Sequence, residues 1–395
     1  SNGLEKRPKL RFPGFDEPYK QCRIGDIYAE RSQRGASDME LLSVTMNDGV
    51  MPRSEIEGKD NSSEDKSNYK VVLTGDMVYN SMRMWQGANG ISPCDGIVSP
   101  AYTVLMPKIP ISNGYFAAFF KSPNLINEFR KNSQGMTSDT WNLKYPQIET
   151  IKVCIPALSE QNRVADMLRT LERRIAKQAQ LVDNLKKYKR GVVRTLLSPD
   201  SCCIEETTWT TAKIGDLGSF TKGAPLSKAD ITPDGTPFIL YGELYTTYHE
   251  VINSVIRRTK AQPEKQYYSH VGDVIIPTSG ETPEEISTAA CVMLPDIILA
   301  GDLNIFRSSK IDGRIMSYIL NHIVNGQIAR IAQGKSVVHI QASEISKIEI
   351  SYPDYNTQCK MISVFETVGA RIKSAENELT YLRTMQKALL QQLFI

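Results

Sequence analysis

Two long segments of the chain place apolar residues at the spacing of a coiled-coil helix. Within residues 157–197 the steps between apolar positions alternate between four and three, and residues 354–395 repeat this pattern. Pro156 and Pro353 stand just before the segments, where proline is tolerated, and no proline interrupts either one. We predict two helices, each on the order of 60 Å long. Their predicted seams are Val164, Leu168, Leu171, Ile175, Val182, Leu185, Val192 and Leu196 in the first helix, and Met361, Phe365, Val368, Ile372, Ala375, Leu379, Leu382, Leu389 and Leu393 in the second.

The two helices belong to an internal duplication. A constant shift of 197 residues, from 156 to 353, superimposes Pro156 on Pro353 and Gln161 on Gln358 without a gap. The same shift carries Gly75-Asp76 onto Gly272-Asp273, and Ile-Gly-Asp stands near the start of each copy, at 24–26 and 214–216. Two copies are too few for a solenoid, so each module needs its own core. The predicted parts are module 1 (1–155), helix 1 (156–198), module 2 (199–352) and helix 2 (353–395).

Polar residues interrupt both seams at corresponding places. Gln178 aligns with Ala375 and Lys189 with Gln386, and isolated polar residues in a seam commonly fix its register. Each helix could pack on its own module, but the long, narrow seams favour pairing of the two helices with each other. The basic run 186–190 in helix 1 is either a solvated face or a contact for phosphates or an acidic partner.

Short β-branched and aromatic runs between turn signals predict an α+β fold for each module. In module 1 we expect strands at 69–73, 77–80 and 102–106 and a helix at 115–132. In module 2 we expect strands at 238–241, 274–277 and 304–308 and a helix at 314–332.

The loops of the modules diverge while the framework repeats, as expected of two copies that contact different partners. They carry side chains able to bind base edges and phosphate oxygens, although polar loops are often merely solvated. Trp141 is as well suited to the core as to a contact. The candidate DNA-binding residues are Arg31, Arg34, Arg53, Ser81, Arg83, Trp85, Gln86, Asn89, Thr137, Ser138 and Asn142 in module 1, and Arg257, Arg258, Lys260, Thr278, Ser279, Lys335, Ser336 and His339 in module 2.

Composition is that of a soluble globular protein, with 41% hydrophobic and 23% charged residues. A net charge of +3 permits nucleic-acid binding without arguing for it. No apolar run is long enough for a membrane span, and we interpret Ser1-Asn2-Gly3 as the remnant of a cleaved tag, with no signal peptide after it. The 7 cysteines and 4 histidines lack metal-site spacing, so we expect neither metal nor disulfides, as in a reducing cytoplasm.

Catalytic motifs are absent from the sequence. Residues 333–336, Gln-Gly-Lys-Ser, imitate only the end of a phosphate-binding loop, because Ala329 replaces its first glycine. There is no dinucleotide-binding glycine pattern, no Asx-Pro-Pro-aromatic run of the amino-methyltransferases and no paired-histidine motif. We therefore predict a non-catalytic protein. A protein–protein adaptor dimerised by its coiled coil and a self-contained modification enzyme remain the alternatives.

One element of the sequence resembles a known family. Gly135, the run Trp141-Asn142-Leu143, Ile155-Pro156 and Glu160-Gln161 lead into a long helix, and the element occurs twice. It is similar to the specificity subunits of Type I restriction-modification systems, as is the opening Leu10-Arg11-Phe12-Pro13-Gly14-Phe15. In the second copy Tyr355-Asn356-Thr357 replaces Leu158-Ser159-Glu160, which weakens the motif there.

The resemblance covers the chain and implies a definite arrangement. Each module would be a target recognition domain that reads one half of a bipartite sequence in double-stranded DNA. The helices would form an antiparallel coiled coil that sets the gap between the halves. Modification subunits with S-adenosylmethionine and restriction subunits with ATP and Mg would be the partners, in the cytoplasm of a bacterium or archaeon, and this chain would itself bind no cofactor and no membrane.

Overall fold

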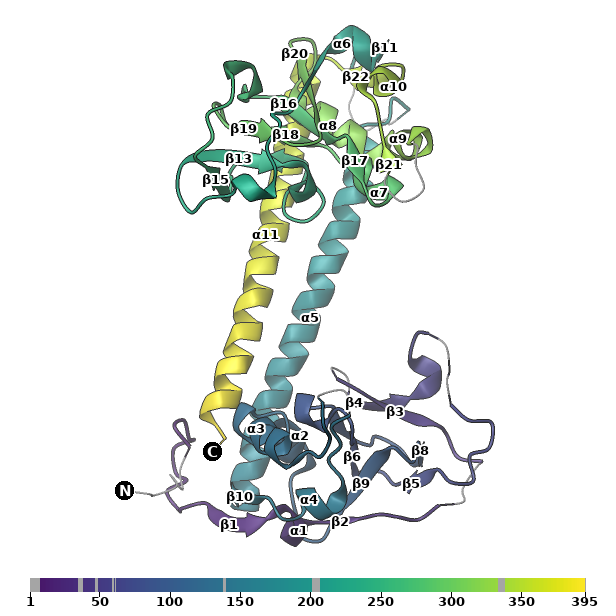
Figure 1. The fold of residues 1–395 in the computed structure, drawn as a ribbon, viewed down its shortest axis with the longest axis vertical. Helices are drawn as coiled ribbons and strands as arrows, with labels where there is room; N and C mark the ends of the chain where they lie inside the picture. The colour runs from purple at the N-terminus through teal and green to yellow at the C-terminus, as the bar shows by residue number, and fades with distance from the viewer. Residues whose placement is uncertain are drawn as a thin grey trace. The chain divides into compact units, whose positions relative to one another are not determined.

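The protein folds as two compact units in a computed structural model (Figure 1). The structure describes residues 8–34, 38–46, 49–58, 60, 62–137, 140–200, 207–332 and 338–394. Unit 1 comprises Ser1–Gln180 and Glu376–Ile395, and unit 2 comprises Leu181–Ala375. Each unit therefore contains one module together with part of each long helix.

Unit 1 is built on a four-stranded antiparallel sheet in the order β2-β9-β6-β7. The pairs β1-β10, β3-β4 and β5-β8 are also antiparallel. The elements of this part of the chain are β1 (Lys20–Arg23), α1 (Ile24–Ile27), β2 (Tyr28–Glu30), β3 (Leu42–Thr45), β4 (Gly49–Pro52), η1 (Arg53–Glu55), β5 (Lys70–Val72), β6 (Met77–Asn80), η2 (Met84–Gln86), β7 (Asn89–Ile91), β8 (Gly96–Val98), β9 (Tyr102–Pro107), α2 (Asn113–Phe119), α3 (Pro123–Asn132), α4 (Tyr145–Ile148), β10 (Lys152–Ile155) and α5 (Leu158–Leu196).

Unit 2 contains a five-stranded sheet in the order β12-β20-β16-β18-β14 and a three-stranded sheet, β15-β13-β19. Its elements are β11 (Trp209–Lys213), α6 (Ile214–Leu217), β12 (Gly218–Lys222), η3 (Lys228–Asp230), β13 (Thr236–Leu240), η4 (Tyr241–Glu243), β14 (Val251–Ile252), β15 (Arg257–Thr259), η5 (Lys265–Tyr267), β16 (Asp273–Pro277), β17 (Ser279–Gly280), α7 (Pro283–Ile286), β18 (Ala290–Val292), β19 (Ile298–Ala300), β20 (Leu303–Ser308), α8 (Gly313–His322), α9 (Asn325–Ile331), β21 (Val338–His339), α10 (Ala342–Ile345), β22 (Glu349–Pro353) and α11 (Tyr355–Gln392).

The α+β prediction is confirmed, and each predicted strand has a counterpart within a few residues. The single helix predicted in each module is wrong, because two short helices stand there. In unit 1, Pro123 cannot continue α2, and Ser122 caps α3 by accepting a hydrogen bond from the Leu125 amide. In unit 2, α8 ends at His322 and α9 begins at Asn325, so the β-branched residues Ile323 and Val324, which have low helix propensity, separate the two helices.

The duplication is visible in the hydrogen bonds that attach each long helix to its module. The buried Gln161 side chain accepts a bond from the Ser112 amide at 3.0 Å and donates one to the Pro156 carbonyl at 2.9 Å. Gln358 makes the same pair of bonds in unit 2, accepting from the Asp312 amide at 2.9 Å and donating to the Pro353 carbonyl at 2.8 Å. The repeated proline and glutamine thus orient the start of each helix.

The two long helices contact each other within each unit. In unit 1, Val164 and Leu168 of α5 share a core with Leu389 of α11 and with Leu393 just beyond it. Further along α5, an ion pair of 2.9 Å joins Arg174 to Glu378 of α11. The order of these contacts makes the pair antiparallel. In unit 2, the end of α5 shares a core with the start of α11 through Val193, Leu197, Met361 and Phe365.

The predicted pairing is therefore confirmed. The seam residues Val164, Leu168, Leu171, Ile175, Val182, Leu185, Met361, Phe365, Val368, Ile372, Leu379 and Leu382 are all buried or half-buried. Near the end of α5 the prediction is off by one residue, since Val193 and Leu197 are buried and Val192 and Leu196 only half-buried. A straight helix drifts by about 20° per heptad against a 3.5-residue repeat, which accounts for the change.

Each unit includes the far end of a long helix in its core. Phe394, just beyond α11, stacks on Phe119 with ring centroids 5.3 Å apart and meets Tyr115 edge-on at 5.2 Å in unit 1. Leu197, which the repeat aligns with Phe394, is buried in the core of unit 2. Among the described residues, no helix combines the length and apolarity needed to cross a membrane.

Candidate nucleic-acid interface

Two loops of unit 1 are joined by backbone hydrogen bonds at the end of the main sheet. The loop after β6 meets the loop after α3 where the Leu143 amide donates to the Ser81 carbonyl at 2.9 Å. Gln134 and Asn142 exchange two backbone bonds of 3.0 and 2.8 Å, which closes the second loop. Candidate residues far apart in the sequence, Ser81 and Asn142, therefore lie together.

A hollow of about 260 Å³ opens at this junction. Lys70 donates to Glu30 at 3.2 Å and to the Tyr102 carbonyl at 2.8 Å, so its charge is compensated. Arg34 and Lys144 are exposed and form no ion pair among the described residues. The hollow is lined by Glu30, Arg34, Lys70, Ser81, Pro100, Ala101, Thr103, Asn142, Lys144, Tyr145 and Pro146.

The polar groups of the hollow suit a nucleic acid. The Asn142 amide oxygen is buried and has no hydrogen-bond partner, a costly state that a ligand donor would relieve. Base amino groups are such donors, and exposed Arg and Lys side chains bind phosphates. Sequence reasoning found Arg34, Ser81 and Asn142 but missed Lys144, although Lys144 follows Asn142 by only two residues.

An aromatic cluster adjoins the hollow along the same two loops. Trp85 and Trp141 meet edge-to-face with ring centroids 5.2 Å apart, and the Arg130 guanidinium lies 6.0 Å from the Trp141 ring. The Trp85 indole donates to the Met82 carbonyl at 3.0 Å, which fixes the loop after β6. Arg83 is exposed and lies 3.5 Å from the Gln86 side chain. Trp141 is half-buried and packs on the candidate residue Trp85. Arg130 was not among the predicted DNA-binding residues.

Unit 2 joins its corresponding loops in the same way. The Ile340 amide donates to the Thr278 carbonyl at 2.9 Å, which repeats the Leu143–Ser81 bond at the 197-residue shift. Strands β17 and β21 then pair Ser279 with His339. The candidates Thr278 and His339 thus correspond to Ser81 and Asn142, so the repeat-related positions carry different polar side chains.

A lysine of β12 reaches the same end of the sheet in unit 2. Lys222 donates to Asn304 at 2.8 Å, and Asn304, which is fully buried, also donates to the Ile340 carbonyl at 3.4 Å. Partial burial lowers the pKa of Lys222. No sequence signal pointed to this lysine, because its neighbours come from strand pairing.

Some candidates belong to the framework instead. Three candidate side chains are buried and hydrogen-bonded within their units: Asn89 donates to the Gly87 carbonyl, Ser279 donates to Asp302 at 2.7 Å, and the Ser81 hydroxyl lies 2.8 Å from that of Thr103. Arg31 forms two bonds with Asp76 (2.6 and 3.1 Å), and the repeat-related Asp273 is held in the same manner by Arg307. Arg31 therefore orients the turn before β6.

The other candidates lie on surfaces of their units. Arg53 donates to the carbonyls of residues 56 and 58, and Thr137 is exposed. Ion pairs with acidic neighbours orient Arg257 (Glu243, 3.1 Å) and Lys260 (Asp234, 3.1 Å), and Arg258 donates to the Gly235 carbonyl at 2.9 Å. Ser138, Lys335 and Ser336 lie outside the described residues.

Comparison with known proteins identifies the fold. Residues 206–383 match the model of the Type I restriction modification DNA specificity domain. A chain in a structure concerned with complex assembly and conformational transition of the type I R-M system is similar with a TM-score of 0.62 and 13% identity, covering 98% of this chain and 99% of that chain. The S subunit of the Type-I restriction-modification system from M. genitalium is similar with a TM-score of 0.59 and 14% identity, covering 98% of this chain and 99% of that chain. The HsdS subunit from Thermoanaerobacter tengcongensis is similar with a TM-score of 0.51 and 14% identity, covering 99% of each chain.

The family match covers module 2 and most of α11, and the shared hydrogen bonds make module 1 a second copy of the same framework. The resemblance found in the sequence is confirmed. Residues 206–383 thus match the Type I restriction modification DNA specificity domain, and the chain has, over nearly its whole length, the fold of solved S subunits of Type I restriction-modification systems.

Proposed function

We propose that the chain is the sequence-specific DNA-binding subunit of a Type I restriction-modification complex, in which each module reads one half of a bipartite target. One observation carries this proposal. The same pair of loops, joined by the same backbone bond, brings Ser81, which is buried, and Asn142 together in one unit and Thr278 and His339 together in the other. A common framework with different polar side chains suits two readers of different sequences.

Physical magnitudes favour a two-part reader. Each mismatched base pair costs about 1–3 kcal/mol, so one module that contacts a few base pairs discriminates modestly. Linking two modules through the paired helices raises the effective concentration of the second module at its half-site. The helices would then set the gap between half-sites and offer a docking surface to the modification subunits.

The chemistry of the complex would belong to its partners. The sequence lacks the motifs for binding nucleotide or S-adenosylmethionine, and within the described ranges no three His, Cys, Asp or Glu side chains gather as a metal site. Modification subunits would supply S-adenosylmethionine-dependent methylation, and restriction subunits would supply ATP- and Mg-dependent cleavage. Such a complex would act on cellular DNA, so the proposal includes a cytoplasmic location for the chain.

Module exchange tests the division into two readers. Residues 1–155 are replaced by the first module of another specificity subunit, and modified adenines are mapped after assembly with the modification subunits. We expect one half of the gapped target to change, and exchange of residues 199–352 to change the other half. A chimera that kept the parental target in full would contradict the proposal.

Salt dependence distinguishes DNA reading from a role as a protein adaptor. The affinity of a DNA-binding chain falls steeply with salt, because phosphate contacts release counterions. We therefore expect a linear fall of log affinity with log salt concentration for duplex DNA carrying the mapped target. A flat response would favour the adaptor.

A further inference from the structure

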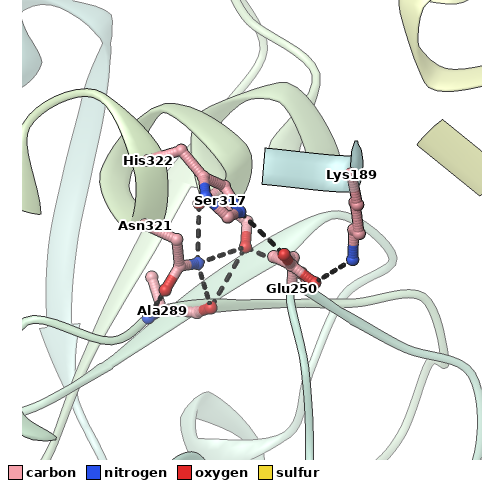
Figure 2. Close-up of polar contacts among 6 residues, drawn as sticks. All are labelled: Lys189, Glu250, Ala289, Ser317, Asn321 and His322. Atoms are coloured by element: carbon pink, nitrogen blue, oxygen red, sulfur yellow. Dashed lines mark hydrogen bonds and ion pairs between the residues drawn. The ribbon is translucent and has the colours of Figure 1, made fainter. Parts of the chain in front are cut away.

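A partly buried ion pair fixes the end of α5 to module 2. Figure 2 shows Glu250 between Lys189 of α5 and His322 of α8. The Glu250 side chain is 12% exposed, and its backbone carbonyl accepts bonds from the Cys291 amide (2.8 Å) and the Ser317 hydroxyl (2.7 Å). Hydrogen bonds from β18 and α8 thus fix the backbone of Glu250 and, with it, the position of the carboxylate.

Both carboxylate oxygens of Glu250 are occupied. The Lys189 ammonium lies 2.7 Å from one oxygen, and the His322 imidazole lies 2.8 Å from the other (Figure 2). Lys189 also stands 5.4 Å from the centre of the Tyr318 ring. Burial alone would raise the pKa of Glu250, but the bond with His322 and the charge of Lys189 outweigh burial and lower the pKa to about 2. The carboxylate is therefore charged at neutral pH.

The supporting helix is itself tied to the sheet. The Asn321 side chain donates to the Ala289 carbonyl at 2.7 Å and to the Ser317 carbonyl at 2.8 Å, which joins α8 to the strand that follows Ala289 (Figure 2). Glu250 therefore occupies a fixed position in module 2, and a positively charged side chain can pair with it only from one place. Lys189 reaches this point from a seam position of α5.

An apolar seam by itself tolerates slippage, because successive turns present similar side chains. A single polar residue with a unique partner disfavours the slipped registers, since each of them would leave a partly buried charge unpaired. The duplication offers an internal comparison: the repeat-related residue in α11 is Gln386, which carries no charge. The ionic attachment is thus particular to the end of α5.

We propose that Lys189, through its ion pair with Glu250, is a positioning residue that fixes the register of α5 on module 2 and thereby the gap length that the protein accepts. This inference rests on the proposed function. A slip of one helical turn moves the helix by about 5.4 Å, equivalent to about 1.6 base pairs at 3.4 Å each. Loss of the pair should therefore admit gaps one or two base pairs from the parental length.

Lys189→Met tests the proposal in the chain assembled with its modification subunits. Methylation rates are measured on duplexes that keep both half-sites and vary the gap in steps of one base pair. We expect the preference for the parental gap over its neighbours to fall about tenfold, equivalent to about 1.4 kcal/mol, with the half-site preferences unchanged. Glu250→Gln removes the same pair from the other side and should give the same broadened profile, which guards against a folding defect of one variant.

Lys187→Met is the matched control, since Lys187 is exposed on the same helix and forms no ion pair within the described residues. It should leave the gap profile unchanged. If Lys189→Met and Glu250→Gln both lowered the melting temperature but kept the parental profile, the pair would be merely structural and the inference overturned. A wild-type complex indifferent to gap length would instead overturn the proposed function itself.

Discussion

Removal of the Phe394 ring tests whether the end of α11 completes the core of unit 1. Phe394 is 3% exposed, stacks on Phe119 and meets Tyr115 edge-on. Truncation of a buried phenylalanine to alanine typically costs about 3–5 kcal/mol, through lost burial and the cavity left behind. At about 1.4 kcal/mol per decade, 3 kcal/mol corresponds to about a hundredfold or more in the opening equilibrium of the unit.

Hydrogen exchange measures this loss unit by unit. In Phe394→Ala, the amides of α2 should lose about two orders of magnitude of protection, because α2 carries both ring partners. The amides of α8, in unit 2, should change little. Leu197→Ala is the converse variant: its side chain is 2% exposed in the core of unit 2, so α8 should lose protection and α2 should not. Unchanged protection of α2 in Phe394→Ala would refute the assignment of the helix end to that core.

Three further outcomes follow from the structure. Arg34→Gln should weaken binding of all duplexes similarly and reduce the slope of log affinity against log salt by about 1, as measured by DNA titration; an unchanged slope would remove Arg34 from the phosphate contacts. Gly191→Ala should stabilise the protein by about 0.5–1 kcal/mol in chemical denaturation, since a Cβ there meets nothing within 4 Å in a helix interior; destabilisation would contradict this reasoning. Because the pKa of Glu250 is lowered from 4.5 to about 2, its charge contributes stability above pH 4.5 that is lost as the pH falls toward 2. The stability difference between wild type and Glu250→Gln should therefore shrink over that window, and a constant difference from pH 7 to pH 2 would contradict the ion pair.

The repeated pattern of the chain was readable from sequence because its signals are local or periodic. Heptad spacing predicted both long helices, and the 197-residue shift predicted that the two modules share a framework. The hydrogen bonds of Gln161 and Gln358 explain why the proline and glutamine recur, since each pair holds the start of a helix. The predicted strands needed only the alternation of β-branched residues and turn signals.

Tertiary structure decided which polar residues are accessible and which partners they have. Polarity alone does not distinguish Asn142, which lines a hollow, from Asn89, which is fully buried, because burial depends on strands distant in sequence. Lys189 was recognised as an interruption of the seam, yet its partner Glu250 lies beyond the helix and could not be inferred from spacing. Periodicity is a property of residues close together in the sequence and can therefore be detected without the structure. A binding surface or an ion pair, in contrast, arises only when long-range packing brings separate segments together.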